Sequence, residues 1–392
     1  MYPRRKKVAA VSFLVLGFNL ACNTARANNG SELSANGALA AGMGGVGIAI
    51  PQGATAAADN PAGMAGVGTR LDLYGVLVSA RVNASFGTET NSHFSNVIQP
   101  APGFGFNYQI DPRWTVGVSV TGAGLGTKYS SPALPIPGLA DARSSLMIVR
   151  TSPTVTYKPA SNVSLGASLI IGAQQFRANG VVGAGPGGPA AVPTHGDSYA
   201  GGIGAGFGVL WDLTPMVSLG ASYYTKTRFS PLAGYRDDLL ASSNGHLDSP
   251  SKYGVGIAVR PLSGLTIGAD FLRILWSGAA GYNDPATFNW HDQNVFRIGV
   301  SYDINPSWTV RAGFSAANSF IDSDHTLANF YANGITTKSV TAGFSYNVDK
   351  ANTVTFALEY DIPRTVTGTG PSTGTNISAK SQWYTIGYTH KF

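Results

Sequence analysis

The last eleven residues of the chain, QWYTIGYTHKF, alternate between two kinds of side chain. A mostly aromatic or apolar set contains Tyr384, Ile386, Tyr388, His390 and Phe392, and a mostly polar set contains Trp383, Thr385, Gly387, Thr389 and Lys391. Successive side chains of a β-strand point to opposite faces, so the segment is predicted to be a strand with one apolar face. A final strand of this kind that ends in Phe is typical of bacterial outer-membrane β-barrels.

The same alternation recurs along the chain. It is found at residues 103–110, 114–121, 162–169, 202–211, 308–315 and 340–347. In these segments apolar residues alternate mostly with Gly, Ser, Thr or Asn. One alternating segment is a weak signal, but a series of about ten-residue segments separated by turns predicts a transmembrane barrel.

Six short turns set the expected number of strands. They are Asp111-Pro112, residues 158–161, 212–215 and 260–264, Asn305-Pro306, and residues 349–352, and five of the six contain Pro. Pro fixes a turn dihedral and cannot donate to a strand ladder. Six periplasmic turns join seven hairpins, which predicts an all-β fold with 14 antiparallel strands. The longer outer loops are expected near 85–99, 122–145, 176–198, 226–250, 277–292, 316–336 and 362–379.

The N-terminus has the pattern of a secretory leader. Four basic residues, 4–7, precede an apolar run from Val8 to Leu20, and Ala25-Arg26-Ala27 is a small-x-small cleavage site. Residues 1–27 are therefore predicted to be a cleaved signal peptide. Cleavage before Cys22 as a lipoprotein is the alternative, which the preceding Asn19-Leu20-Ala21 fits poorly. A soluble β-sandwich array is the alternative to the barrel, and the leader and final aromatic disfavour it.

Composition excludes several classes of function. Five of the 26 basic residues and none of the 20 acidic residues lie in the leader, so 21 and 20 remain and the mature chain is nearly neutral. The basic pI is thus no sign of nucleic-acid binding. Cys22, the only cysteine, lies in the leader. The six His have no repeated metal spacing, and no set of residues stands out as a catalytic centre. We expect no cofactor and no enzyme activity.

Residues 28–68 precede the first expected wall strand, which should begin near Arg70. They are rich in Gly and Ala, as in ALAAGMGGVGIAIPQGATAAADNPAGMAGVG. Small side chains suit a segment that folds within a barrel, where space is scarce. The sequence therefore predicts a plug at 28–68 and a barrel at 69–392.

Two stretches of this plug carry a family resemblance. Residues 37–45, GALAAGMGG, and 56–64, AAADNPAGM, resemble the N-terminal hatch of the FadL/TodX channels for long-chain fatty acids and hydrocarbons. The Asn-Pro-Ala-Gly core at 60–63 is the most specific mark. The resemblance runs the length of the mature chain, through Gly124-Leu125 and residues 308–313, and is loose in the outer loops.

The resemblance implies passive transport of hydrophobic molecules, above all long-chain fatty acids or aromatic hydrocarbons. In that scheme outer loops capture the ligand, a tighter site in the lumen receives it, the hatch rearranges, and a lateral opening in the wall releases the ligand into the membrane. Asn60, Pro61 and Ala62 match the hatch motif. The lateral opening falls on Gly122, Gly124, Leu125 and Gly126. A structural turn and an ordinary strand end are the plainer interpretations of these two sets.

Further residues are candidates for contact with ligand. Six apolar residues of the third and fourth outer loops are candidates to capture ligand: Val181, Val182, Val192, Phe229, Leu232 and Leu239. Alternatively, they belong to flexible loops without a role in binding. Arg297 and Arg311 are predicted by parity to face the lumen, as are Arg260, Asp270 and Glu359. Arg297, Arg311 and Arg177 are candidates to bind a carboxylate. Alternatively, such charges pair with one another.

The expected partners follow from the same scheme. They are a hydrophobic small molecule, outer-membrane lipid and lipopolysaccharide, and the barrel-assembly machinery, which would bind the C-terminal strand; nucleic acid is excluded. The alternative function is a general diffusion porin for polar solutes. A porin needs an open, charged constriction, and a plug of 40 residues argues against it.

Overall fold

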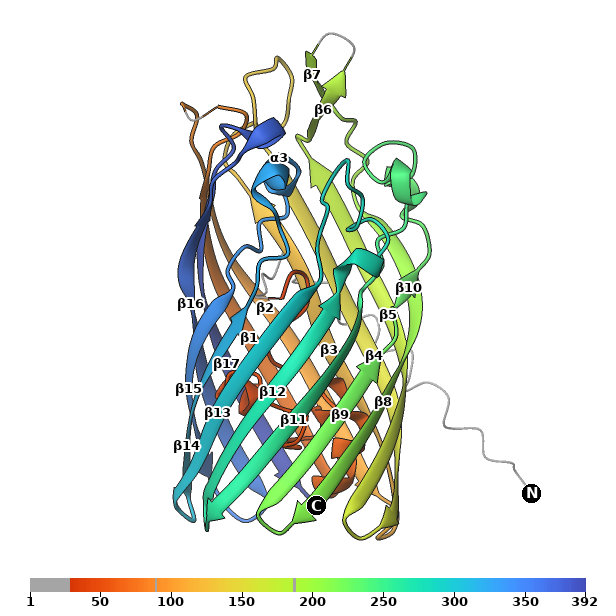
Figure 1. Ribbon diagram of the computed structural model, residues 1–392, viewed down its shortest axis with the longest axis vertical. Coiled ribbons are helices and arrows are strands. Elements are labelled where there is room, and N and C mark those ends of the chain that lie inside the picture. The colour runs from red at the N-terminus through yellow and green to blue at the C-terminus, as the bar shows by residue number, and fades with distance from the viewer. Residues whose placement is uncertain (1–28, 89, 186–187) are drawn as a thin grey trace, which may run out of the picture.

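The computed structural model describes residues 29–88, 90–185 and 188–392. The predicted leader, with Cys22 and both proposed cleavage sites, lies outside the described residues. Long strands rise from short turns at one end of the molecule to long loops at the other, here called the turn end and the loop end (Figure 1). Among the described residues there is no helix that is long and apolar enough to cross a membrane.

Fourteen antiparallel strands close into a barrel, as predicted. Each wall strand pairs with the next wall strand along the chain, and β8 pairs with both β5 and β9. The barrel closes where β17 pairs with β1 over fifteen residues. The wall strands are β1 (Arg70–Ala84), β2 (His93–Gln109), β3 (Trp114–Lys128), β4 (Arg143–Ala160), β5 (Val163–Asn179), β8 (Ser198–Thr214), β9 (Val217–Tyr224), β11 (Ser251–Leu262), β12 (Leu265–Leu275), β13 (Gln293–Asn305), β14 (Trp308–Ala317), β15 (Lys338–Asn347), β16 (Asn352–Val366) and β17 (Ile377–Lys391).

The alternation of the sequence becomes the two faces of this wall. In β17, Tyr384, Ile386 and Tyr388 are exposed outward, whereas Thr385 and Thr389 are buried toward the lumen. Exposed Val, Leu, Ile and aromatic side chains continue around the barrel. An outward apolar band of this kind is what a lipid environment requires of a transmembrane barrel.

All six predicted turns join the strand pairs expected of them. In four turns a side chain closes the bend, and in one of them Thr214 Oγ1 accepts from the amides of Met216 and Val217 at 3.2 and 3.0 Å. Asp111 Oδ1 accepts from the amides of Arg113 and Trp114 at 2.7 and 2.8 Å. Asn305 Oδ1 and Asp349 Oδ1 accept in the same way from the residues two and three positions later. Asn and Asp at such positions stabilise a turn because the side chain mimics a backbone acceptor.

Several predicted outer loops are longer than the observed ones. Residues 93–99 belong to β2, β3 continues to Lys128, and β4 begins at Arg143, so the predicted loops 85–99 and 122–145 are each partly strand. The predicted loop 176–198 likewise includes residues 176–179 of β5 and residue 198 of β8. At the loop end the inward side chains are apolar, for example Leu146 and Phe176, so the alternation between apolar and polar residues fades while the strand continues.

Short elements fold over the loop end of the barrel. They are a hairpin, β6 (Val182–Gly185) and β7 (Gly188–Ala191), the two-residue strand β10 (Arg228–Phe229) on β8, the turns η4 (Ala233–Tyr235), η5 (Ala241–Ser243), η6 (Trp276–Gly278), η7 (Ser323–His325) and η8 (Gly370–Ser372), and the helix α3 (Thr326–Asn329). Their apolar side chains form one buried cluster with the inner wall.

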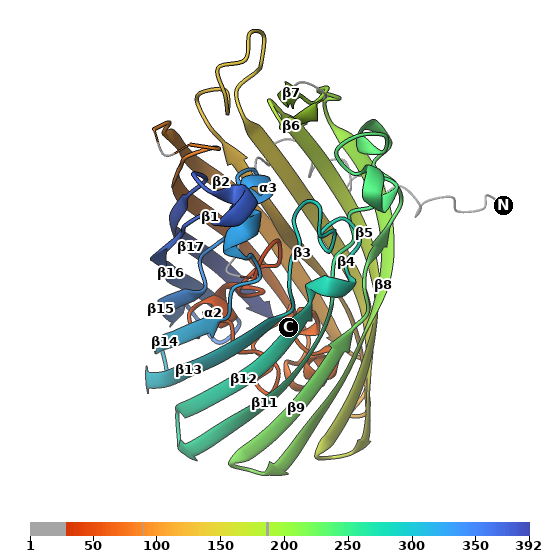
Figure 2. The ribbon, with the colours of Figure 1, turned by 45° about the horizontal axis from the view of Figure 1, so that its top comes forward.

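Residues 29–68, here called the hatch, lie inside the barrel (Figure 2). They form α2 (Ala38–Ala41), η2 (Ala56–Ala58) and η3 (Pro61–Gly66) with connecting turns. Inward glycines make room for them. A Cβ on Gly166 would lie 2.3 Å from the Ala62 nitrogen, and one on Gly208 would lie 1.9 Å from Asn60 Oδ1. The glycines of the predicted polar face thus allow the hatch to touch the wall backbone.

Candidate functional site

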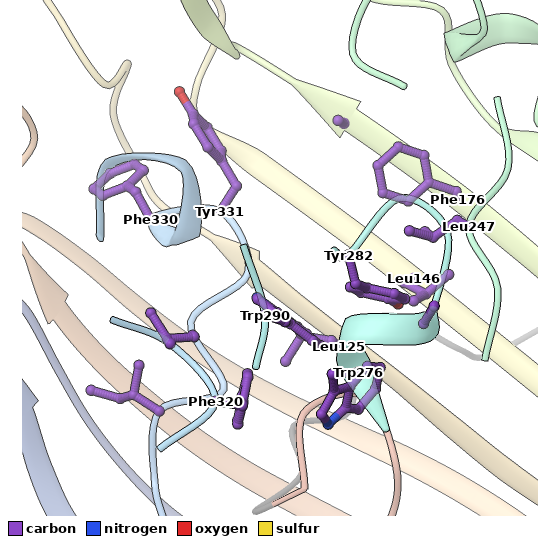
Figure 3. Packing of buried hydrophobic residues seen from close by; sticks show 14 of the residues in the cluster. Leu125, Leu146, Phe176, Leu247, Trp276, Tyr282, Trp290, Phe320, Phe330 and Tyr331 are labelled. Carbon is purple, nitrogen blue, oxygen red and sulfur yellow. The ribbon is translucent and has the colours of Figure 1, made fainter. Parts of the chain in front are cut away.

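A large apolar cavity lies beneath the outer loops. Its volume is about 830 Å³, within the range of roughly 300–1,000 Å³ usual for small-molecule sites. The wall contributes Leu125, Leu146 and Phe176, and the loops contribute Tyr282 and Tyr331 from the other sides (Figure 3). These side chains belong to the buried cluster at the loop end.

The predicted capture residues fall into two groups. Val181, Val182, Val192 and Leu239 line the cavity. Phe229 and Leu232 do not line it; they are buried in the same apolar cluster, behind the cavity wall. Their role in capture stays a prediction, but the third and fourth loops do come together here.

Aromatic rings form the floor of the cavity. Tyr282, which lines it, stacks on Trp290 with 4.4 Å between ring centroids, and Trp290 meets Trp276 edge-on at 4.7 Å. The hatch lies directly below these rings, since a Cβ on Gly30 would be 2.5 Å from the Trp276 ring. Gly30 has φ +68°, so both its conformation and its surroundings favour glycine.

The first turn of the hatch, Asn29–Glu32, ties this floor to the wall. Tyr282 Oη donates to Ser31 Oγ at 3.4 Å, and the Gly124 amide of β3 donates to the Ser31 carbonyl at 2.9 Å. Next to Ser31, the Glu32 carboxylate accepts from both Arg150 of β4 and Lys252 of β11. Burial alone raises the pKa of Glu32, but the two cations outweigh burial and bring it down to about 2.

Beside this turn the ladder between β2 and β3 is interrupted, and this interruption is here called the gap. β2 and β3 are paired only from Phe104–Val120 down to Gln109–Thr115, whereas β3 pairs β4 along its whole length up to Lys128–Arg143. At the top, the Lys128 amide donates to Ser95 Oγ of β2 at 3.1 Å. Between these two points the described ladder of β2 and β3 is interrupted.

Two prolines stand on the edge of this gap. In β2 the Gln109 amide donates to Thr69 Oγ1 on the β1 side, and the Ile110 amide donates to Trp114 on the β3 side. Because amide direction alternates along a strand, even-numbered residues of β2 direct their nitrogens toward β3. Pro100 and Pro102 are even-numbered and carry no N–H, so they disfavour a continuous ladder here.

Gly124 is the strained position on the opposite edge. Its φ is +156°, and a Cβ would lie 2.3 Å from the Leu146 carbonyl oxygen. The predicted opening residues Gly122, Gly124, Leu125 and Gly126 therefore all lie along the part of β3 that faces the gap. Leu125 also lines the cavity, so the gap and the cavity share a residue.

The hatch motif is bound to the wall at its other end. Asn60 is fully buried; its Nδ2 donates to the Ile48 carbonyl at 2.8 Å and to the Val209 carbonyl of β8 at 3.0 Å. Its Oδ1 accepts from the Ala62 amide at 3.0 Å and caps η3, which Pro61 begins. The Pro61 carbonyl accepts from Thr156 of β4 at 3.2 Å.

The three arginines predicted to bind a carboxylate do not line the apolar cavity. Arg177, at the loop end of β5, lies 3.8 Å from Asp197 and donates to Asn179. Arg297 and Arg311 face the lumen as parity predicted, but at the level of the hatch. Arg297 donates to the Gly45 carbonyl at 2.8 Å, and Arg311 donates to Ser345 at 2.7 Å.

The lumen carboxylates also bind the hatch. Asp270 accepts from the Gly47 and Ile48 amides at 2.8 and 3.1 Å, and Glu359 accepts from Ser34 at 2.6 Å. On the hatch itself, burial raises the pKa of Asp59, an effect that Arg297 opposes. Sequence reasoning did not single out Glu32, Arg150 or Lys252, because nothing in their spacing connects them. No cluster of three or more potential metal ligands occurs in the described ranges.

The fold of this chain is similar to that of several solved structures. The solved structures similar to this chain include the toluene transporter TbuX of Ralstonia pickettii, at 21% identity, with a TM-score of 0.68 over 92% of this chain and 99% of that one. The toluene transporter TodX of Pseudomonas putida matches at 20% identity, with a TM-score of 0.72 over 93% and 100%. A FadL homologue from Pseudomonas aeruginosa matches at 15% identity, with a TM-score of 0.70 over 93% and 100%.

The structural similarity shows the fold alone at these low identities, and a family model shows the family. None of the curated proteins compared with this chain matches it in sequence. The model described as outer membrane protein transport protein (OMPP1/FadL/TodX) matches residues 21–392, nearly the whole chain. The chain is therefore a β-barrel of the bacterial outer membrane and belongs to the OMPP1/FadL/TodX family of transport proteins.

Proposed function

We propose that this protein carries hydrophobic molecules, of the fatty-acid or aromatic-hydrocarbon kind, passively across the outer membrane. The observation that carries the proposal is the position of the cavity: apolar, beneath the loops, closed below by the hatch and bordered by Leu125 at the gap in the wall. The toluene transporters and the FadL homologue with the same fold support it. The proposed role requires no chemical step and no cofactor.

The proposed route leaves the barrel sideways. An apolar molecule enters between the loops, occupies the cavity, and passes the floor at Tyr282 when the first turn of the hatch moves. It then leaves between β2 and β3, beside Gly122, Gly124 and Gly126. Since each buried CH₂ gains about 0.8 kcal/mol, release into lipid costs far less than release into periplasmic water.

The hatch is the part that moves in this proposal. Its first turn occupies the inner side of the gap, through the contact of Ser31 with Gly124, while the Asn60-Pro61-Ala62 motif anchors its other end. A polar-solute porin is not supported, because the hatch fills the lumen at the level where a porin needs a water-filled constriction. Lipopolysaccharide around the loop end and the barrel-assembly machinery at β17 remain the expected partners.

Uptake by cells tests the function. Cells that express the chain should take up radiolabelled toluene or oleate faster than cells with the empty vector, and in proportion to the amount of folded barrel. A polar sugar of similar mass should enter at the same rate in both. Faster sugar uptake without faster uptake of either hydrophobic compound would refute the proposal in favour of a porin.

A further inference from the structure

Two cations of the lumen wall converge on a carboxylate that the chain itself supplies. Arg150 Nη1 donates to Glu32 Oε2 at 3.2 Å and Arg150 Nη2 donates to Oε1, while Lys252 Nζ donates to Oε2 at 3.2 Å. All three side chains are largely buried, with 6% of Glu32, 12% of Arg150 and 18% of Lys252 exposed. Arg150 also donates to Ser249 Oγ at 2.9 Å. This two-pronged contact, in which both terminal nitrogens of one guanidinium donate to the two oxygens of one carboxylate, is common where proteins bind carboxylates.

This ion cluster lies below the cavity floor. Arg150 follows Leu146, a cavity residue, by four positions on the same inward face of β4, a rise of about 13 Å at roughly 3.3 Å per residue. Tyr282, another cavity residue, contacts Ser31 beside Glu32. A molecule with its tail in the cavity would therefore bring a head group toward Arg150 and Lys252, where Glu32 already lies.

Among the described residues, the cavity lining offers no cationic side chain for an anion. Its described lining contains no Lys, Arg or His, and its one charged residue is the acidic Asp238. The hydroxyls there are bonded within the protein: Ser144 donates to the Tyr331 carbonyl and Tyr331 donates to the Gly180 carbonyl at 2.9 Å. Arg177 is outside the lining and lies beside Asp197.

Further acidic residues of the hatch and lumen lie near Lys252 and near the neighbouring cation Arg297. Asp59 of the hatch is buried within electrostatic reach of Lys252 and Arg297. Asp270 faces Arg297 across β12 and β13. Arg150, Lys252 and Arg297 thus already have acidic neighbours in Glu32, Asp59 and Asp270. An incoming carboxylate would have to displace Glu32, and a displaced Glu32 would be a buried charge without a partner, which is strongly unfavourable.

We propose that Glu32 is a specificity-determining residue: by occupying Arg150 and Lys252 it makes the cavity a site for neutral hydrophobic molecules and excludes fatty-acid anions. This inference rests on the proposed function and names its substrate class. The proposal also predicts a latent carboxylate site. Once Glu32 is neutralised, Arg150 and Lys252 would be free to bind the carboxylate of a ligand in its place.

Matched ligand pairs test the selectivity of the wild-type protein. The pairs are toluene with benzoate and hexadecanol with palmitate, whose members differ mainly in the carboxylate. Binding to the detergent-solubilised protein at pH 7.5 is followed by tryptophan fluorescence, since Trp290 stacks on Tyr282, which lines the cavity. We expect each neutral member to bind at least roughly 100-fold more tightly than its anion, as expected when a site cannot pair a polar group.

Glu32→Gln tests the assignment to this residue. The variant should bind palmitate about tenfold or more tightly than the wild type does, with hexadecanol nearly unchanged, and Arg150→Gln in the same background should cancel the gain. Asp237→Asn, which removes an exposed loop charge outside the lining, is the matched control and should leave both affinities unchanged.

The outcomes separate this inference from the proposed function. Equal affinity of the wild type for palmitate and hexadecanol would overturn the selectivity, even if Glu32→Gln fails to fold, and would leave a hydrophobic channel standing. If Glu32→Gln gains palmitate affinity and keeps that gain when Arg150→Gln is added, the latent carboxylate site is overturned. Binding of neither member of either pair would overturn both this inference and the proposed function.

Discussion

The Gly124 amide nitrogen and the Ser31 carbonyl oxygen are 2.9 Å apart, in a hydrogen bond that joins β3 to the first turn of the hatch. Ser31 also accepts from Tyr282, which lines the cavity. The cavity floor, the hatch and the edge of the wall gap are therefore in direct contact. In the proposed route, a ligand that displaces Tyr282 would act on the same turn that contacts Gly124 at the edge of the gap.

A disulfide across the gap should block lateral release. A Cβ on Gly122 would lie 4.0 Å from the Ala101 Cβ, close to the distance of about 3.8 Å in disulfides. Oxidised Ala101→Cys/Gly122→Cys protein should lose most toluene uptake, and reductant should restore it. Each single variant is the control. Full uptake by the oxidised protein, with the cross-link verified by mass spectrometry, would exclude the gap as the exit.

Gly124→Ala should slow transport without unfolding the barrel. The φ of +156° and the close Leu146 carbonyl disfavour any side chain, at a cost of about 1–3 kcal/mol, so alanine should shift the backbone of β3 at the edge of the gap. Roughly tenfold or slower uptake is expected, given about 1.4 kcal/mol per factor of ten. Gly75→Ala is the matched control, because its Cβ would meet nothing within 4 Å. Equal uptake by the two variants would contradict a role for the Gly124 backbone conformation in transport.

Asn60→Ala should loosen the hatch. It removes bonds to Ile48, Val209 and Ala62, and leaves buried backbone groups unpaired at about 1–3 kcal/mol. We expect residues 29–68 to become cleavable by added protease at a lower urea concentration than in the wild type. Asn83→Ala, at an exposed outward position, serves as the control. An unchanged cleavage profile would show that the motif does not anchor the hatch.

Deletion of residues 28–68, with the leader kept, should open the lumen. Hatch contacts extend from Asn29 to the Gly68 carbonyl, which accepts from Asn107 of β2 at 2.7 Å. Single-channel conductance in planar bilayers should rise above that of the intact protein. The variant must first show the heat-dependent gel mobility of a folded barrel. Unchanged conductance through a folded variant would contradict a plug.

Acid should weaken hatch docking through Glu32. Its pKa falls from 4.5 to about 2 in the folded protein, so its ion pairs stabilise the docked hatch fully above pH 4.5. That contribution, on the order of 3 kcal/mol, is lost as pH falls toward 2. Asp59 acts in the opposite direction, because its pKa is raised and its ionisation opposes docking.

Comparison with Glu32→Gln isolates the Glu32 contribution, since Asp59 is present in both proteins. The difference in the urea midpoint of hatch cleavage should be largest at pH 7 and should disappear near pH 2. A difference that does not change with pH would mean that Glu32 acts through packing and not through its charge.

Much of the barrel could be predicted because its constraints are local. Turn residues such as Asp111 and Asn305 act on amides two and three positions away, and the period of two in β17 needs no distant partner. The loop end was harder, because Leu125 and Leu146 face inward and make both faces of their strands apolar. There the periodic signal disappears just where the cavity begins.

The site depends on contacts that sequence spacing does not record. The alternation of side chains correctly predicted that Arg297 and Arg311 face the lumen. It does not show how far along the barrel axis a residue lies, and both arginines lie at the level of the hatch. Glu32 meets partners 118 and 220 residues away. No local pattern marks it within a Gly- and Ala-rich segment, so only the register of the closed barrel brings these charges together.

The interruption between β2 and β3 has a consequence for the cell. If cargo leaves through this flank into lipid, the hatch needs to shift only its first turn, and the anchored remainder can stay in the lumen. No continuous column of water then forms during uptake. The bacterium would gain access to scarce oily nutrients while its envelope stays tight to ions and to hydrophilic antibiotics.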